Sequence, residues 1–257
     1  MKCYELSHQK NIRDLGGLVG FNNRLIKEGR LYRGGYFGKV NDEDVSILES
    51  LHLTDVIDFR SSDEFNTRPD YRLKGVKYHN FTTFEHEMKK EDKKYEDGNL
   101  LWFVDKGVSG KEHLTKTYKE LIDTVEGQEA YRNMFNLLLQ DDKRVVYFHC
   151  SQGKDRAGLA AFFIEMALGV LLDKAKEDYL LSNVAMEKKV DTLINSVKDK
   201  PFYNKEYHQS LLDVFSAKIE YLEEAIDVIN KKYAGIENYL RNILNVDIEK
   251  FRKYYLS

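Results

Sequence analysis

The sequence predicts an α/β fold in which a small central sheet is covered by helices. The pattern runs strand, helix, strand in the N-terminal third, and a later strand leads through a short loop into an apolar helix, an order typical of such folds. After that helix the apolar spacing stays near 3.6 residues to the end of the chain. No Pro-, Gly- or Ser-rich linker divides the 257 residues, so we expect one domain over residues 1–257.

The elements follow from local patterns. Residues 18–35 have β-branched and aromatic residues around Asn22 and Asn23, as a hairpin would. Asn41 or Asp42 can cap a helix that runs to about residue 51. The remaining expected elements are strands at 54–59 and 76–81 with a loop and one helical turn between them, helices at about 114–125 and 128–140, a strand at 144–149, a helix ending near Gly169, and further helices to residue 257.

Two segments carry alternatives. Residues 85–111 are nearly all charged in their first half, and we expect a solvated excursion there, with a mobile flap over a site as the alternative. The helical region 174–216 is either an ordinary helical layer or a lid over the site.

Composition excludes several classes of protein. Lys and Arg total 40 and Asp and Glu total 43, a net charge of −3, which argues against a general nucleic-acid or membrane-surface binder. Two cysteines, Cys3 and Cys150, form neither a disulfide framework nor a four-sulfur zinc site. The first residues lack the apolar segment of a signal peptide, and the stretch 157–172 is too short to span a bilayer. We expect a cytoplasmic location, with unconventional secretion left open.

The segment 145–158, VVYFHCSQGKDRAG, predicts an anion-binding loop. A buried strand delivers Cys150 to the end of a sheet, and Arg156 opens the next helix. A helix N-terminus and converging backbone N–H groups attract an anion, and an arginine binds two phosphate oxygens at once. The residues expected to contact phosphate through this loop and the first helical turn are Ser151, Gln152, Gly153, Lys154, Ala157 and Gly158.

The same positive field favours the thiolate form of Cys150, which can attack phosphorus and form a phosphocysteine that water then hydrolyses. The leaving oxygen needs a proton, so an aspartic acid should lie nearby. The simpler alternative is a buried cysteine that only packs in a strand–turn–helix corner. A turn that served packing alone would not need two cations, Lys154 and Arg156, beside the thiol. A Walker nucleotide loop fails because Asp155 follows Lys154 and Phe148 stands where the first glycine belongs.

At this point the sequence resembles a known family. HCSQGKDRAG (149–158) resembles the HCxxGKDRTG signature of the bacterial atypical tyrosine phosphatases, and NIRDLGG (11–17), LYRGG (31–35) and VIDFRSSDEF (56–65) resemble three further segments of that family. EDYLLSN (177–183) and residues 233–244 are similar too, so the resemblance runs from about residue 8 to the C-terminus, with 85–111 least covered.

The resemblance implies a phosphotyrosine-phosphatase-like fold with a central, mostly parallel sheet of 4–5 strands flanked by helices. It also implies phosphomonoester hydrolysis with neither metal nor cofactor. The substrates implied are phosphotyrosine and, more broadly, phosphoserine, phosphothreonine and phosphoinositides. Partners would be phosphorylated proteins or phosphoinositides, with phosphate, sulfate or vanadate as ligands, and neither nucleic acid nor stable membrane insertion.

Residue roles also come from the resemblance. Asp155 is the expected general acid, with Asp58 orienting it, although Asp58 could instead cap a turn or pair with Arg60. Lys154 either meets a second phosphate or completes the charge of the loop. The residues expected to support the loop are His149, Asn11, Arg13, Asp14 and Arg60. Arg33 and Arg60 are more readily structural ion-pair partners than phosphate contacts.

One departure from the family pattern concerns Ala157, which stands where the family has Thr or Ser. A hydroxyl there can help the cysteine thiolate leave the phosphoenzyme, so we expect slow breakdown of that intermediate. A weakly active or inactive phosphate-binding pseudophosphatase is therefore the alternative function. Sulfur transfer or arsenate reduction is disfavoured, because the latter usually needs a nearby second cysteine and Cys3 is distant in the sequence.

Overall fold

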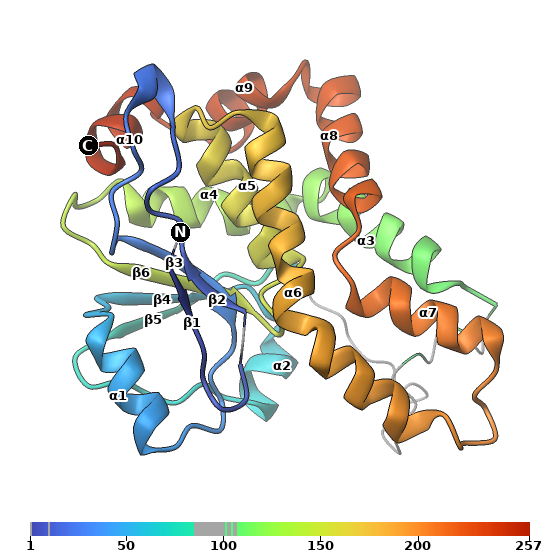
Figure 1. The fold of residues 1–257 in the computed structure, drawn as a ribbon. Coiled ribbons are helices and arrows are strands. Elements are labelled where there is room, and N and C mark those ends of the chain that lie inside the picture. The colour runs from blue at the N-terminus through green and yellow to red at the C-terminus, as the bar shows by residue number, and fades with distance from the viewer. Residues whose placement is uncertain (1, 10, 85–100, 102–103, 105–106) are drawn as a thin grey trace.

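The fold is built on one mixed sheet of six strands in the order β1-β2-β3-β6-β4-β5 (Figure 1). The structure is a computed structural model and describes residues 2–9, 11–84, 101, 104 and 107–257. β3, β6, β4 and β5 run parallel, and β1 and β2 add an antiparallel edge. The strands are β1 (Cys3–Tyr4), β2 (Ile12–Asp14), β3 (Leu31–Gly35), β4 (Asp55–Asp58), β5 (Lys77–Asn80) and β6 (Val146–Cys150).

Strand β6 lies in the middle of the sheet and is buried along its whole length. Its side chains alternate between two cores, with Phe148 and Cys150 in the larger one and Tyr147 in the smaller one. The sequence of a strand that is covered on both faces is a continuous apolar run, and for this reason β6 could be predicted from the sequence.

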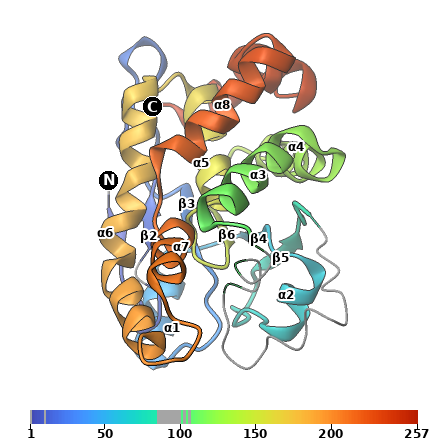
Figure 2. The same ribbon diagram turned by 90° about the vertical axis from the view of Figure 1, so that its right-hand side faces the viewer.

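Helices cover both faces of the sheet. α4, α5 and α10 lie on the face of the larger core, and α1 packs on the other face (Figure 1). The long helix α6 runs along one side of the molecule, next to α7 (Figure 2). The helices are α1 (Asp42–Ser50), α2 (Ser62–Thr67), α3 (Gly110–Asp123), α4 (Val125–Leu138), α5 (Arg156–Leu168), α6 (Leu172–Val197), α7 (Lys205–Phe215), α8 (Ile219–Tyr233), α9 (Ile236–Asn238) and α10 (Ile248–Tyr255), with short turns η1 (Phe21–Asn23) and η4 (Tyr239–Ile243).

Local sequence signals set several helix ends as predicted. Asn41 caps α1 and forms a reciprocal capping box with Asp44. Gly169 ends α5 in the left-handed conformation, at φ 79°, which costs glycine little. The central, mostly parallel sheet flanked by helices, with a helical C-terminal part, confirms the predicted fold class.

The N-terminal segment differs from the expected hairpin. Only an isolated bridge joins Val19 to Leu25, while Leu31–Gly35 pairs in parallel with β6 instead. The reason is burial, because all five residues of β3 are buried in the middle of the sheet. β1 and β2, of two and three residues, bring the sheet to six strands rather than the expected 4–5.

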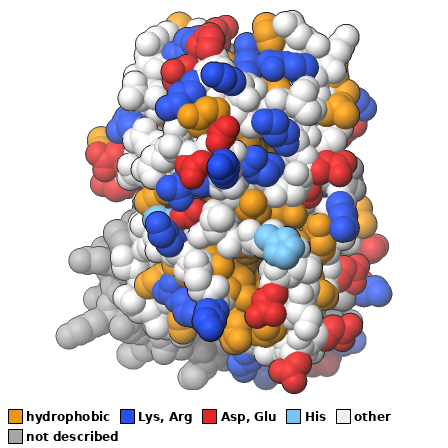
Figure 3. Space-filling view, turned by 90° about the vertical axis from the view of Figure 1, so that its left-hand side faces the viewer, with side chains coloured by type: hydrophobic (Ala, Val, Ile, Leu, Met, Phe, Trp, Pro, Cys, Tyr) orange, Lys and Arg blue, Asp and Glu red, His pale blue; other side chains and the backbone are white. Residues whose placement is uncertain are grey.

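The structure describes one of the two segments for which the sequence left alternatives, 174–216, but only part of the other, 85–111. The expected excursion at 85–111 lies largely outside the described residues. The region 174–216 comprises most of α6 and all of α7. Among the described helices, none combines the length and apolar character that crossing a bilayer requires. On the face seen in Figure 3, positive and negative side chains intermingle, and hydrophobic side chains gather around its lower part.

Candidate active site

Cys150 is the last residue of β6, where the central strand meets the anion-binding loop. Its side chain belongs to the larger core, and the residue is 2% exposed. In the neighbouring strand, Gly35 is its register partner. The fold therefore holds the sulfur at the carboxyl end of the parallel strands, the edge where ligands bind in open α/β sheets.

Glycines allow the loop after Cys150 to lie against β3. Gly153 adopts φ 75°, and a side chain there would collide with the backbone of Gly34. A side chain at Gly34 would collide with the Tyr147 hydroxyl, and one at Gly35 with the amide of Gln9. The two glycines of LYRGG thus leave space for the side chains of Tyr147 and Gln9, and Gly34 lets the loop backbone at Gly153 approach β3.

Polar side chains from the N-terminal strands hold the loop from behind. Asn11 Nδ2 donates to the carbonyl of Gln152 at 3.0 Å, and Arg33 Nη2 donates to the carbonyl of Gly153 at 2.9 Å. Arg13 Nη1 in turn donates to Asn11 Oδ1 at 2.5 Å. These bonds occupy loop carbonyls on the side of β2 and β3, which suits a loop that presents its N–H groups to an anion.

Asp178 of α6 binds both arginines. Its Oδ1 lies 2.8 Å from Arg13 Nε and its Oδ2 lies 2.6 Å from Arg33 Nη1, and all three side chains are at most 3% exposed. Burial raises the pKa of Asp178, but Arg13 and Arg33 outweigh it and lower that pKa. Asp178 is therefore an ionised carboxylate that neutralises part of this buried positive charge.

Glu165 of α5 is buried beside this cluster. Both of its carboxyl oxygens lack a hydrogen-bond donor among the described residues. Burial, followed by the charge of Asp178, raises the pKa of Glu165 well above its usual value. The protonated form of Glu165 is therefore favoured over its carboxylate.

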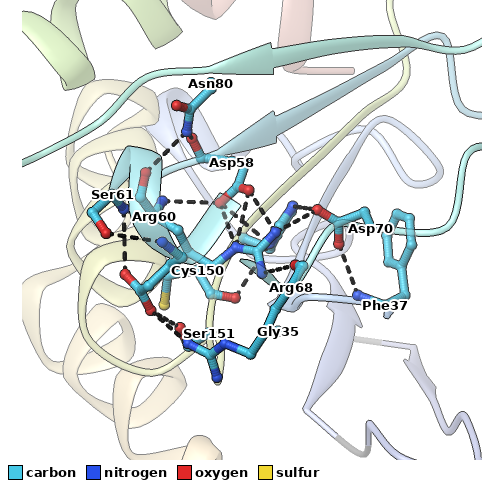
Figure 4. A network of polar contacts seen from close by, with 12 residues as sticks. Gly35, Phe37, Asp58, Arg60, Ser61, Arg68, Asp70, Asn80, Cys150 and Ser151 are labelled. Atoms are coloured by element: carbon cyan, nitrogen blue, oxygen red, sulfur yellow. Dashed lines mark hydrogen bonds and ion pairs between the residues drawn. The ribbon is translucent and has the colours of Figure 1, made fainter. Parts of the chain in front are cut away.

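Arg156, the first residue of α5, is held by Glu64 of α2. Arg156 Nη1 lies 2.6 Å from Glu64 Oε2, and Ser151 Oγ donates to Glu64 Oε1. Figure 4 shows Ser151 with the Cys150 sulfur nearby. Burial raises the pKa of Glu64, but Arg156 more than offsets it, so this carboxyl is ionised at neutral pH. Glu64 thereby fixes the guanidinium at the loop.

Lys154 and Asp155 pair with each other. Lys154 Nζ lies 2.7 Å from Asp155 Oδ1 and 3.3 Å from the carbonyl of Ser216, and its side chain is 2% exposed. Tyr118 Oη donates to the same oxygen of Asp155 at 2.9 Å. The ammonium of Lys154 thus points to Asp155 and α7 rather than outward, and Asp155 Oδ2 has no bond among the described residues.

Asp58 pairs with Arg60. Arg60 donates to Asp58 and Asp70 through a buried guanidinium, with Nη2 2.7 Å from each carboxylate (Figure 4). The structure thus brings Asp58 to Arg60 and gives it no contact with Asp155 within the described residues. The expectation that Asp58 orients Asp155 gives way to its alternative, an ion pair, since a buried carboxylate needs a cation as partner.

His149 completes this second cluster. Its Nε2 lies 3.4 Å from Asp70 Oδ2 and its Nδ1 lies 3.8 Å from Asp58 Oδ1. Burial lowers the pKa of His149, but the two carboxylates outweigh it and raise this pKa above its usual value. Asp58, Asp70 and His149 have the ligand atoms for a metal ion, but the Arg60 guanidinium is already bonded to both carboxylates.

Asp14 lies apart from the loop contacts. Its carboxylate accepts from the backbone N–H groups of Gly16 and Gly29, at 2.8 Å and 2.6 Å. It therefore supports the turn after β2 and not the anion-binding loop.

A sequence model of the tyrosine phosphatase family matches residues 4–257. The chain belongs to the tyrosine phosphatase family. A provisionally named tyrosine-protein phosphatase of Cupriavidus necator is 27% identical over 262 residues, which cover 96% of this chain and 86% of that protein. The triple specificity protein phosphatase PtpB of Mycobacterium tuberculosis is 23% identical over 269 residues, 94% of each chain. The resemblance found in the sequence is thus confirmed, and the chain is a protein-tyrosine phosphatase.

Two ionised residues of this phosphatase were not singled out from the sequence. Glu64 belongs to the quoted segment VIDFRSSDEF, and its three-residue spacing from Ser61 marks the capping box that both form. Asp178 belongs to EDYLLSN, and its polar side chain at a buried position of α6 was the available signal. Ala157 is fully buried in the first turn of α5, so nothing there supplies the hydroxyl of the family signature.

Proposed function

We propose that this phosphatase hydrolyses phosphomonoesters through a phosphocysteine intermediate, without a metal ion. The Cys150 thiolate attacks phosphorus, so that an S–P bond forms and the P–O bond to the leaving group breaks. Water then attacks the phosphocysteine, the S–P bond breaks, and phosphate and thiolate are released. The observation that carries this proposal is that Cys150 and Arg156 stand at the two ends of one loop, with Glu64 fixing the guanidinium there.

We assign Asp155 as the general acid. In the first step its proton goes to the leaving oxygen, and in the second step the carboxylate takes a proton from the attacking water. Lys154 and Tyr118 both bind Oδ1, which supports this role because Oδ2 stays available for the proton. Asp155 is partly open to solvent, with a side chain 24% exposed.

The phosphate oxygens would be bound by the loop N–H groups and by the guanidinium of Arg156. Asn11 and Arg33 would keep the loop in shape through its carbonyls, and Arg13 would act through Asn11. His149, with Arg60, Asp58 and Asp70, would fix the strand end beneath Cys150. The residues of the loop and first helical turn that would contact the phosphate are Ser151, Gln152, Gly153, Lys154, Ala157 and Gly158.

Phosphotyrosine is the proposed main substrate, with phosphoserine, phosphothreonine and phosphoinositides as further substrates. The name of the mycobacterial relative, a triple specificity phosphatase, supports this breadth. Inorganic phosphate, sulfate and vanadate should bind as competitive ligands, and neither nucleic acid nor stable membrane insertion is part of this function. We place the enzyme in the cytoplasm as a single domain over residues 1–257.

The decisive experiment measures phosphate release from an aryl phosphate with EDTA present. Cys150→Ser should abolish turnover, while Cys3→Ser, at the exposed second cysteine, should match the wild type. Loss of wild-type turnover in EDTA would refute the metal-free mechanism. Vanadate binding without any turnover would favour the pseudophosphatase instead.

The region 174–216 is proposed as a lid. Limited proteolysis with and without vanadate tests this, because closure over the bound anion should protect α6 and α7. Unchanged protection would leave them as a fixed helical layer.

A further inference from the structure

Two buried tyrosines, Tyr118 of α3 and Tyr179 of α6, connect Asp155 to the interior of the protein. Tyr118 Oη donates to Asp155 Oδ1 at 2.9 Å, and the hydroxyl oxygens of the two tyrosines lie 2.7 Å apart. Tyr118 is 0% exposed and Tyr179 is 1% exposed. Two hydroxyl groups therefore lead, one after the other, to the carboxyl group that we assign as the general acid.

The number of protons fixes the direction of this chain of hydrogen bonds. A phenol has one proton, and Tyr118 uses its proton in the bond to Asp155, so Tyr179 must donate to Tyr118. Burial, followed by the negative charge of Asp155, raises the pKa of both tyrosines, so both keep their protons at neutral pH. Asp155 Oδ1 is an acceptor whether the proton of this carboxyl is on Oδ2 or has left. The chain therefore keeps one orientation in both states of the acid.

Packing and an ion pair hold Tyr179 in this place. Gly158, in the first turn of α5, lies against its ring, and a Cβ at Gly158 would be 3.3 Å from two of the ring carbons. The rings of Tyr118 and Tyr179 meet edge to face, with their centres 6.4 Å apart. The preceding residue, Asp178, is bound to two buried arginines. The position of the Tyr179 hydroxyl is thus set by the fold around it.

The carboxyl of Asp155 has two hydrogen-bond donors within the described part of the chain, Lys154 and Tyr118, and both bind Oδ1. Lys154 is also bonded to the carbonyl of Ser216 and brings a positive charge to the loop. The bond from Tyr118 can therefore be removed without removing a cation. The other titratable groups whose charge acts on Asp155 are Arg156 of α5, Tyr131 of α4, Tyr179 of α6 and Tyr221 of α8.

We propose that Tyr118 and Tyr179 are positioning residues that hold Asp155 for proton transfer and stabilise the carboxylate that it becomes. This inference rests on the proposed function, in which Asp155 protonates the leaving oxygen. The O–H bond at Oδ2 breaks, an O–H bond forms on the leaving oxygen, and neither tyrosine gives up its proton. As the carboxylate becomes negative, the bond from Tyr118 strengthens, and donation by Tyr179 polarises the Tyr118 hydroxyl and strengthens that bond further. Because both donors are already in place, this stabilisation requires no rearrangement.

The experiment compares kcat/KM for an alkyl phosphate and for p-nitrophenyl phosphate. An alkoxide needs the proton far more than p-nitrophenolate does, so the alkyl-to-aryl ratio measures the acid. We expect this ratio to fall about fivefold in Tyr118→Phe and about twofold in Tyr179→Phe, through the loss or weakening of one charge-assisted bond. A ratio taken within each variant cancels any general loss of activity.

Tyr221→Phe is the matched control. Tyr221 is 0% exposed and its ring centre lies 5.7 Å from that of Tyr118, but its hydroxyl donates to the carbonyl of Asp213. This variant removes a buried hydroxyl from the same aromatic cluster and should leave the ratio unchanged.

The pH profile is a readout that a loss of packing would not move. A hydrogen bond to a carboxylate favours its ionised form, so without the bond Asp155 keeps its proton to higher pH. The alkaline limb of kcat/KM for the alkyl phosphate should therefore move up by about one pH unit in Tyr118→Phe and by less in Tyr179→Phe. In an Asp155→Asn background, Tyr118→Phe should not change the alkyl-to-aryl ratio, because no carboxyl proton is left to transfer.

The outcomes separate this inference from the proposed function. If the wild type fails to hydrolyse an aryl phosphate, or if Asp155→Asn keeps the wild-type ratio, the proposed function is wrong and the inference falls with it. If Asp155→Asn lowers the ratio but Tyr118→Phe changes neither the ratio nor the alkaline limb, the inference alone is overturned. An equal fall in Tyr221→Phe would also overturn it, by showing an effect of packing. An effect of Tyr118→Phe with none of Tyr179→Phe would overturn the role of Tyr179.

Discussion

Replacing Asp178 by Asn should destabilise the enzyme by about 3 kcal/mol. The substitution leaves Arg13 and Arg33, at 3% and 0% side-chain exposure, without their ionised partner. Breaking a buried pair on one side costs about 3–5 kcal/mol, and the lower end applies because the amide keeps one hydrogen-bond acceptor. For a chain of this size that corresponds to a fall in Tm of roughly 6–12 °C.

Glu165 should limit this loss. The charge of Asp178 helps to keep Glu165 neutral, so its removal lets Glu165 ionise and supply a negative charge to the arginines. Glu165→Gln alone should therefore stabilise the enzyme at pH 7, because the amide removes the cost of protonating this buried carboxyl on folding, but combined with Asp178→Asn it should cost over 1 kcal/mol more than the sum of the single variants. Because the folded pKa of Glu165 is raised, its contribution to stability is present below about pH 4.5 and is lost as the pH rises.

The assay is urea denaturation of the four proteins at pH 5 and pH 7. Glu177→Gln is the matched control, since Glu177 precedes Asp178 but is 63% exposed and should shift stability by less than about 0.5 kcal/mol. If Asp178→Asn costs under about 1 kcal/mol, or if the double variant is merely additive, the assignment of ionised Asp178 and neutral Glu165 is wrong.

Three further predictions concern turnover. Glu64→Gln should lower kcat/KM for an aryl phosphate about tenfold by releasing Arg156, while exposed Glu49→Gln leaves it unchanged; equal values for the two variants would contradict the positioning role. Asp155→Asn should slow an alkyl phosphate about 10²–10³-fold and p-nitrophenyl phosphate far less, and equal losses would remove Asp155 as the acid. In stopped-flow assays the wild type should show a burst followed by a slow steady state, and Ala157→Thr should speed that steady state about fivefold through a hydrogen bond of about 1 kcal/mol to the departing thiolate. Absence of a burst would refute slow breakdown of the phosphoenzyme.

The parts of the fold that the sequence predicted are those with strong local signals. The apolar strand before Cys150 and the apolar helix after Arg156 are buried at nearly every position, so hydrophobic pattern alone located them. β1 and β2 were missed because two or three residues show no periodicity, and β3 was paired wrongly because its partner β6 lies over a hundred residues away.

In the candidate site, too, the residues that could be predicted are those that lie close together in the sequence. The loop from Cys150 to Arg156 is contiguous, so its residue types could be interpreted together. Asp178 and Glu64 act across the fold, on partners that only the folded chain brings near. Lys154 was expected to meet a second phosphate or to complete the charge of the loop, and its sequence neighbours do not reveal its contact with the carbonyl of Ser216 after α7.

The bonds from Asn11 to Gln152 and from Arg13 to Asp178 join positions 141 and 165 residues apart. At a ribosomal rate of about 5–20 residues per second, roughly 10–30 s pass between the synthesis of β2 and that of α6, which carries Asp178. During that interval Arg13 and Arg33, which are buried in the folded protein, lack the carboxylate of Asp178 as their partner. Catalytic competence must therefore arrive late in biosynthesis, and a nascent chain released before α6 would carry the nucleophile without the frame that makes it useful.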